Sequence, residues 1–154
     1  MHRTQSYNEM SARYTPLPDV NYVPTIGRLM INAGTGNKQA GTISGAEDLK
    51  IDAARAFQAN LQQHYVEAER LYQQALKEGV PKELARICLP VGRYTRMRAS
   101  ANLRNWLAFL TLRMDTKAQW EIRQYANAVG DIIKKRFPRT WELFIGEMEA
   151  KLKP

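Results

Sequence analysis

The sequence predicts a single domain, residues 1–154, that is mostly α-helical, with about five helices after a polar N-terminal segment of loop and strand. Three observations support this prediction. Apolar residues recur at three- and four-residue steps from Ile51 to Ala75, which is the spacing of one helix face. A second apolar run with this period covers Leu103 to Leu110. The first 44 residues instead hold three prolines and four glycines, a composition typical of loops.

Within the N-terminal segment, residues 20–23 favour a short extended piece because Val20 and Val23 frame it. Residues 32–44, NAGTGNKQAGTIS, have the composition of a flexible loop. Such a loop has two interpretations: a solvated connection, or a mobile flap over a ligand.

The first helix is predicted over residues 47–78, where Gly79 supplies a stop. A second helix is predicted over residues 81–89 and must end ahead of Pro90. The third, around residues 103–112, is apolar nearly all round, so we expect it to be the central helix.

A fourth helix is predicted to run from Asp115, as its N-cap, toward Phe137. Pro138 interrupts the pattern. A last helix follows, with an apolar face that comprises Trp141, Phe144, Ile145, Met148 and Leu152.

Charge is the least ordinary part of the composition. Lys and Arg total 23 against 15 Asp and Glu, so the net charge is +8 and the isoelectric point is near 9.8. Residues 81–113 hold seven basic residues, six of them Arg, against the single acid Glu83, a net charge of +6. This balance predicts an anionic partner: nucleic acid, an anionic membrane surface or a phosphorylated small molecule. Arginine suits bidentate contact with phosphate.

Several kinds of site are excluded by the residues present. His2 and His64 are 62 residues apart, with no acidic pair at ligand spacing, so no metal site is expected. Cys88 is the single cysteine and favours an inert buried thiol over a nucleophile. Residues 34–41 lack the Lys-Ser/Thr ending of a phosphate loop. With no apolar leader in residues 1–8 and no long apolar run, we expect no membrane segment and a cytoplasmic location.

The chain opens with an unusually polar run, MHRTQSYNEMSARY, in which eleven of fourteen side chains can hydrogen-bond. One interpretation is a frayed N-terminal tail. The other is a set of donors and acceptors arranged around a multidentate polar ligand.

Three blocks of sequence resemble the flavin-dependent thymidylate synthases. The opening is similar to that family's R-H-R-x7-S signature and its S-x-N-E-x-S-x-R-Y extension, with His2, Arg3 and Ser11 in register. The second block resembles the family's E-x-A-R-x-x-L-P segment and reads ELARICLPVGRYTR. The third resembles the family segment that begins N-x-R and reads NLRNWLAFLTLRMDTKAQWEIRQYA. The blocks stand in the family's order and together cover nearly the whole chain.

The resemblance implies an α+β fold in the family, with this chain forming a mostly helical part of it. It implies reductive methylation of dUMP to dTMP, with methylenetetrahydrofolate as carbon donor, FAD as hydride carrier and NADPH as reductant. All these ligands are anionic, in keeping with the charge. It also implies a homotetramer, with no nucleic-acid or membrane partner.

The resemblance assigns roles to matching positions. Arg113 is implied as catalytic, because a permanently charged guanidinium can stabilise the N3-deprotonated pyrimidine. The residues implied to bind dUMP are Glu9, Met10, Ser11, Ala12, Arg13, Arg86 and Arg113. The residues implied to bind FAD are His2, Arg3, Glu9, Asn102, Leu103 and Arg104.

Two departures from the family pattern affect these expectations. Family members have about 70–80 further N-terminal residues, and Met1 stands where the signature has its first Arg. Ala108 replaces a polar residue that contacts flavin in the family. An alternative is therefore a catalytically silent fragment that acts as an assembly or binding partner. A basic helical nucleic-acid binder is disfavoured, because the arginines alternate with apolar core positions.

Overall fold

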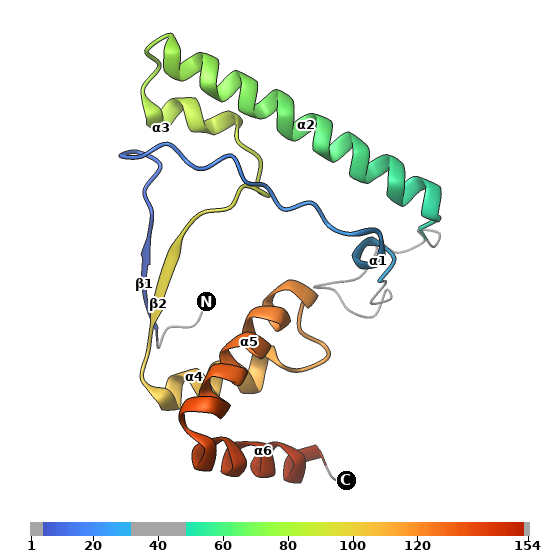
Figure 1. Cartoon of the computed structure of the whole chain (residues 1–154), viewed down its shortest axis with the longest axis vertical. Helices are drawn as coiled ribbons and strands as arrows, with labels where there is room; N and C mark the ends of the chain where they lie inside the picture. Colours follow the sequence, from blue (N-terminus) through green and yellow to red (C-terminus); the bar gives the residue numbers. More distant parts are fainter. Residues whose placement is uncertain (1–4, 32–48, 153–154) are drawn as a thin grey trace. The chain divides into compact units, whose positions relative to one another are not determined.

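The computed structural model describes residues 5–31 and 49–152. The chain forms two compact units by its internal contacts (Figure 1). The first, which we call the long-helix unit, comprises residues 7–31 and 49–98 of the described chain. The second, the helical unit, comprises the described residues 5–6 and 99–152.

The long-helix unit is built on α2 (Ile51–Lys77), a helix of 27 residues. Its apolar stripe buries Ala54, Tyr65, Ala68 and Tyr72. Gly79 has φ +83°, and the Val80 N–H donates to the Ala75 carbonyl over 2.9 Å. This is the glycine stop expected from the sequence. The predicted helix over residues 47–78 is thus confirmed from Ile51 to Lys77. Leu49 and Lys50 precede the helix, and residues 47–48 lie outside the described part.

Three short helical pieces pack on α2: α1 (Ile26–Leu29), α3 (Lys82–Ala85) and the 3₁₀ turn η1 (Arg86–Cys88). The predicted second helix therefore forms as α3 and η1, with Leu89 in extended conformation before Pro90. α1 was not expected from the sequence, since four residues are too few to show a period.

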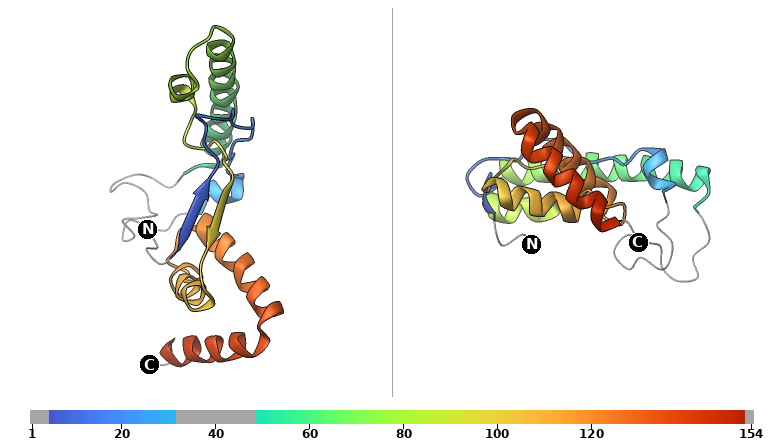
Figure 2. Two further views of the ribbon diagram at one scale, coloured as in Figure 1. Left: turned by 90° about the vertical axis from the view of Figure 1, so that its left-hand side faces the viewer. Right: turned by 90° about the horizontal axis from the view of Figure 1, so that it is seen from below.

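Two strands, β1 (Ser6–Glu9) and β2 (Met97–Ser100), form a two-stranded sheet and lie side by side in both figures (Figures 1 and 2). Nearly all their side chains are exposed, so no alternation of apolar residues marks them in the sequence. The pairing continues beyond the strands, where the Met10 N–H donates to the Arg96 carbonyl over 2.8 Å.

The predicted extended piece over residues 20–23 forms an antiparallel bridge rather than a strand. Asn21 pairs with Arg93. The Tyr22 N–H donates to the Gly92 carbonyl over 2.8 Å, and the Tyr94 N–H donates to the Val20 carbonyl over 2.9 Å. The bridge joins residues 20–22 to residues 92–94, a stretch that also forms one wall of the site described below.

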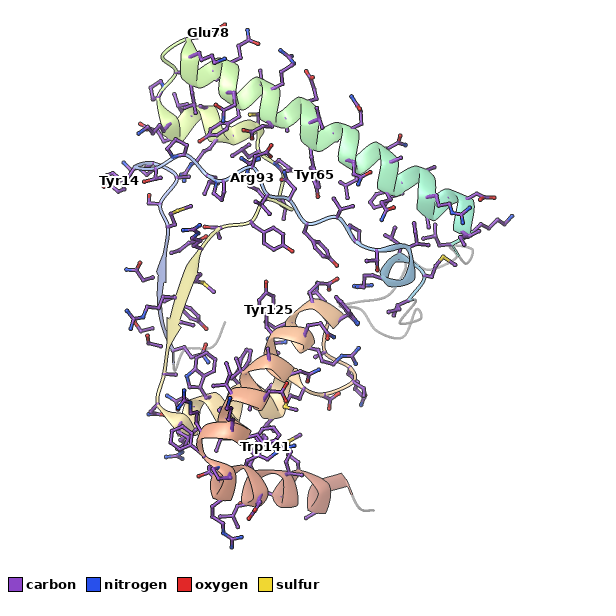
Figure 3. All side chains as sticks on the ribbon, in the orientation of Figure 1. Tyr14, Tyr65, Glu78, Arg93, Tyr125 and Trp141 are labelled. Carbon is purple, nitrogen blue, oxygen red and sulfur yellow. The ribbon has the colours of Figure 1, made fainter. Side chains whose placement is uncertain are left out.

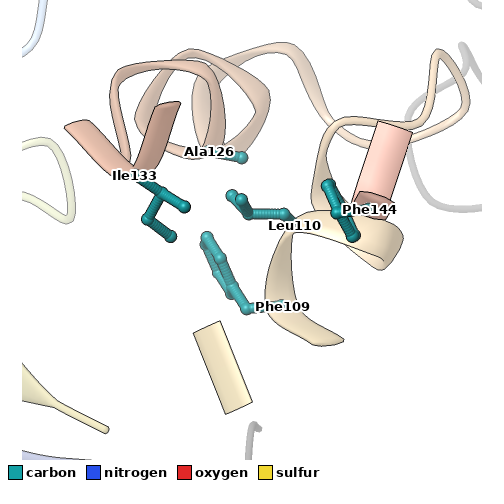
Figure 4. Packing of buried hydrophobic residues seen from close by; sticks show 5 residues of the cluster. All are labelled: Phe109, Leu110, Ala126, Ile133 and Phe144. Carbon is teal, nitrogen blue, oxygen red and sulfur yellow. The ribbon is translucent and has the colours of Figure 1, made fainter. Parts of the chain in front are cut away.

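The helical unit consists of α4 (Leu103–Arg113), α5 (Trp120–Arg136) and α6 (Pro138–Leu152). Its core side chains point toward one another from all three helices, as Figure 4 shows: Phe109, Leu110, Ala126, Ile133 and Phe144. Trp106 and Trp141 pack against this cluster. The three predicted helices are confirmed in number and order.

Two details of that prediction are wrong. Asp115 does not cap α5, because its carboxylate accepts from the Lys117 N–H and its carbonyl accepts from the Ala118 N–H, closing a separate turn before the N-cap Gln119. α4 is also not the central helix. α5 packs against both α4 and α6, and Leu112 of α4 is 60% exposed. None of the described helices is both long and apolar enough to cross a lipid bilayer.

Candidate functional site

A pocket of about 450 Å³ lies wholly within the long-helix unit. Two stretches of chain far apart in sequence line it. The first follows β1 and contributes Glu9, Met10, Ser11, Ala12 and Leu17. The second begins at η1 and contributes Arg86, Leu89, Pro90, Arg93 and Thr95.

The first wall is a turn at the end of β1. The Ser11 carbonyl accepts from the Tyr14 and Thr15 N–H groups over 3.1 and 3.2 Å, and its hydroxyl accepts from the Arg13 N–H over 3.4 Å. Ala12 is buried inside this turn. The Lys82 ammonium donates to the Tyr14 carbonyl over 3.0 Å and so ties the turn to α3. The polar run that opens the chain is thus ordered from Gln5 onward, and within the described residues the frayed-tail interpretation is wrong.

The second wall carries the positive charge. Arg86 is exposed at the start of η1. Within the part of the chain that the structure describes, its guanidinium has no hydrogen-bond or ion-pair partner. The Leu89 N–H donates to the Arg86 carbonyl and the Arg93 N–H to the Pro90 carbonyl, each over 3.0 Å, and these bonds shape the wall.

The two arginines of this wall differ in their surroundings. The Arg93 side chain is 4% exposed and forms ion pairs with Asp19 and Glu69. Arg86 therefore supplies the charge available to a ligand, opposed in the lining by Glu9 alone. A cavity with a guanidinium and a hydroxyl at its surface suits a small phosphorylated ligand.

Tyr65 of α2 packs against the second wall, and Figure 3 shows it beside Arg93. Its hydroxyl donates to the Tyr22 carbonyl over 2.9 Å. Burial raises the pKa of Tyr65 above its ordinary value, which keeps the hydroxyl protonated as a donor. A Cβ on Gly92 would collide with this hydroxyl, so glycine is required by close approach.

Five of the seven residues expected to bind dUMP lie together around this pocket: Glu9, Met10, Ser11, Ala12 and Arg86. Arg13 is the next residue along the chain and is exposed without lining the pocket. Arg113 is half-buried at the end of α4, in the other unit. The residues of the long-helix unit that line the pocket do not include it.

The residues expected to bind FAD divide between the units. Asn102 caps α4 and accepts from the Asn105 N–H over 2.9 Å. Leu103 is half-buried, and Arg104 is exposed in the first turn of α4. His2 and Arg3 lie outside the described residues, as does the loop at residues 32–44.

The sequence did not indicate five of the lining residues as site residues: Leu17, Leu89, Pro90, Arg93 and Thr95. The last four stand inside the ELARICLPVGRYTR block, so their neighbourhood was marked though their roles were not. Leu17 lies between two prolines with no periodic pattern, and nothing in the sequence could have signalled it.

Two other features are less suited to chemistry. A pocket of about 240 Å³ between α4 and α6 has a mixed lining of apolar side chains and two threonines, with Glu147 as its one charged residue. Cys88 is half-buried, and its thiol faces the Ala85 and Ala68 carbonyls at 3.2 and 3.7 Å. No group of described His, Cys, Asp and Glu residues could hold a metal ion.

Known proteins are similar to this chain over almost its whole length. The flavin-dependent thymidylate synthase of Thermosipho africanus is 38% identical over 144 residues, which are 94% of this chain and 60% of that protein. The enzyme of the same name from Thermus thermophilus is 41% identical over 143 residues, 93% of this chain and 49% of that protein. The chain thus spans about half to three fifths of the length of these relatives.

Solved structures agree in fold. The UMP/dUMP methylase PolB from Streptomyces cacaoi bound with 5-Br dUMP superposes with a TM-score of 0.78 at 31% identity, covering 94% of this chain and 63% of that one. Its structure bound with 5-Br UMP gives a TM-score of 0.81 at 30% identity, with 65% of that chain covered. The family model described as thymidylate synthase complementing protein matches residues 1–139. The chain therefore belongs to the thymidylate synthase complementing protein family, and the two relatives named above are flavin-dependent thymidylate synthases.

Proposed function

We propose that this chain is part of a flavin-dependent thymidylate synthase and that its pocket binds dUMP. One observation carries the proposal. Glu9–Ala12 of the signature block and Arg86 of the second block, more than 70 residues apart, line the same cavity. The relatives' names and the 5-Br dUMP in a similar structure support the same substrate.

The side chains of the pocket suit the phosphate end of the nucleotide. Arg86 presents an exposed guanidinium, and Arg13, exposed within the turn after β1, is the second candidate. Each can form paired N–H donors to a phosphate, a geometry that lysine cannot reproduce. The Ser11 hydroxyl supplies a further donor at the pocket surface.

Arg113 remains the candidate for the pyrimidine in this proposal. Its positive charge would stabilise the ring after loss of the N3 proton and so raise the nucleophilicity of carbon 5. The guanidinium does this without losing a proton of its own, which allows it to act throughout the reaction.

The start of α4 fits an anionic cofactor. The exposed Arg104 and the N-terminus of an 11-residue helix offer positive charge to a diphosphate, and Asn102 adds a polar side chain. His2, Arg3 and Glu9 complete the FAD contacts that the family resemblance implies. FAD, when bound, would supply hydride chemistry, and the protein's part is to hold and orient it. NADPH, methylenetetrahydrofolate, a homotetrameric assembly and a cytoplasmic location belong to the same proposal.

The pocket can be tested by calorimetric titration of the purified chain with dUMP. We expect Arg86→Met to weaken dUMP binding at least tenfold, about 1.4 kcal/mol, because a charge-assisted contact is lost. Arg139→Met is the matched control, since Arg139 is an exposed arginine paired with Glu142 and lies outside the pocket. Equal dUMP affinity in the Arg86→Met and wild-type chains would contradict the assignment.

The reaction itself is tested by chromatographic detection of dTMP after incubation with dUMP, methylenetetrahydrofolate, FAD and NADPH. Formation of dTMP supports the proposed activity. Binding of dUMP without dTMP would instead favour the alternative, a catalytically silent chain that serves as a binding or assembly partner.

A further inference from the structure

Arg93 is the most deeply buried charge at the pocket, and its contacts reach three separate segments. Its Nη1 lies 2.8 Å from Asp19 Oδ1 and 2.7 Å from Glu69 Oε2. Its Nη2 donates to the Leu17 carbonyl over 3.1 Å. The guanidinium thus joins residues 17–19, α2 and its own segment at one point, seen beneath α2 in Figure 3.

Two of the joined segments form pocket walls. Leu17 lines the pocket on one side, and Pro90 and Arg93 line it on the other. The backbone bridge between Asn21 and Arg93 runs beside the same contacts. Without the guanidinium, the Leu17 side would still be held by the bridge, by the Tyr65–Tyr22 bond and by the Lys82–Tyr14 bond. It would lose the contacts that fix residues 17–19 directly, and with them the link to α2 at Glu69.

Replacement of Arg93 by an apolar residue would lower the stability of the fold, because of the acidic side chains around it. The Glu69 side chain is only 16% exposed, and Arg93 is its ion-pair partner. Its other oxygen accepts from the Gln73 amide over 2.7 Å. Removal of the guanidinium would leave a largely buried carboxylate without a counter-ion.

Arg93 lines the pocket but has little side-chain surface to offer a ligand. Its side chain is 4% exposed, and its Nε is buried without a hydrogen-bond partner. The two nitrogens that carry its contacts are already engaged by Asp19, Glu69 and the Leu17 carbonyl. Its effect on a ligand must therefore pass through the walls that it holds.

We infer that Arg93 is a positioning residue of the nucleotide pocket, which fixes the Leu17 wall and the Pro90 wall on α2 so that Arg86 and Ser11 meet the phosphate together. The inference rests on the proposed dUMP site and adds to it a residue that carries no direct contact. It makes dUMP affinity depend on a buried arginine as well as on the exposed one.

The first experiment compares dUMP affinity among Arg93 variants of the chain, measured calorimetrically well below the melting transition. We expect Arg93→Met to weaken binding about tenfold, and Arg93→Lys to recover part of the loss, since an ammonium can still pair with one carboxylate. Arg70→Met is the matched control: Arg70 is an exposed arginine on α2 that pairs with Glu67, and its loss should leave dUMP affinity within about twofold. Wild-type affinity in a folded Arg93→Met chain would overturn the inference.

A second comparison separates positioning from stability. The double variant Arg93→Met/Glu69→Gln removes the uncompensated carboxylate together with the guanidinium, so its melting temperature should recover toward wild type. We expect dUMP binding to stay weak in this variant, because the Leu17 wall is still released. Binding that recovers together with the melting temperature would show a purely structural role and overturn the inference.

The Asp19→Asn variant tests the positioning role of Arg93 if the Arg93 variants fail to fold. The Asp19 side chain is 59% exposed, so the substitution leaves the interior intact while it weakens the hold on residues 17–19. A rise of about threefold or more in the dUMP dissociation constant supports the inference, and no change overturns it. Absence of dUMP binding by the wild-type chain would refute the proposed site itself, whereas loss in Arg86→Met without loss in the Arg93 and Asp19 variants would refute only the positioning role.

Discussion

The interiors of the two units of this molecule are stabilised by different kinds of interaction. The helical unit closes on an apolar cluster in which Leu110 and Ala126 are fully buried. The pocket region of the long-helix unit is fastened by polar ties instead: the Tyr65 hydroxyl, the Arg93 ion pairs and a backbone bridge. Apolar packing tolerates some imprecision, whereas each polar tie fixes one atom against another. The second kind of construction suits a wall that must face a charged ligand.

The largest effect should follow from opening the apolar cluster. Leu110 is fully buried in α4, so Leu110→Ala should lower the free energy of unfolding by about 3 kcal/mol through lost burial and the remaining cavity. Denaturant unfolding, followed by the fluorescence of the three tryptophans, Trp106, Trp120 and Trp141, measures it. The exposed Leu112 is the control, and Leu112→Ala should cost under about 1 kcal/mol. Similar losses in the two variants would contradict the core as described.

A smaller effect should follow from a substitution that crowds the Tyr65 hydroxyl, one of the polar contacts of the pocket region. Gly92→Ala places a Cβ against the Tyr65 hydroxyl and should cost about 1–3 kcal/mol of stability and weaken dUMP binding. Adding Tyr65→Phe should restore part of the stability by removing the colliding oxygen. Gly27→Ala is the control, since a Cβ there meets no atom within 4 Å. If Gly92→Ala is as stable as Gly27→Ala, the close approach is wrong.

The smallest effect concerns pH. The pKa of Tyr65 is raised by burial in the folded state, so the neutral hydroxyl is favoured there. Its contribution to stability is fully present below the unfolded value of about 10 and is lost as pH rises through the folded value. We therefore expect the wild-type melting temperature to fall more steeply above pH 10 than that of Tyr65→Phe. Parallel curves in the two proteins would show that Tyr65 does not titrate differently on folding.

The same contrast explains what the sequence could predict. The long helix and the three helices of the helical unit were predicted because burial of one face imposes a period on the residues. Ala54, Tyr65, Ala68 and Tyr72 of α2 show that period directly. The strands β1 and β2 expose both faces and leave no such mark. The start of α5 was misjudged because Asp115 closes a turn of its own rather than capping α5, and both uses suit the same residue type.

The candidate site was predicted from the sequence motifs of the family, and not from a periodic pattern of apolar residues. The family blocks led to Glu9, Ser11 and Arg86, which the fold brings to one cavity. They could not lead to Arg93, whose importance depends on two acids from distant parts of the chain, Asp19 and Glu69. A single sequence shows charged residues but not which of them meet.

The contact between Asp19 and Arg93 joins residues 74 positions apart. Between them lies the whole of α2 with its turn into α3, so this contact closes a long loop and carries the entropic cost of that closure. The pocket beside it therefore belongs to the folded state and does not exist in the unfolded chain. A nucleotide that binds it draws the population toward the folded state, by RT ln(1 + [L]/Kd) for free ligand concentration [L]. A higher concentration of that nucleotide would therefore also protect the chain from proteolysis, because proteases cleave the unfolded state.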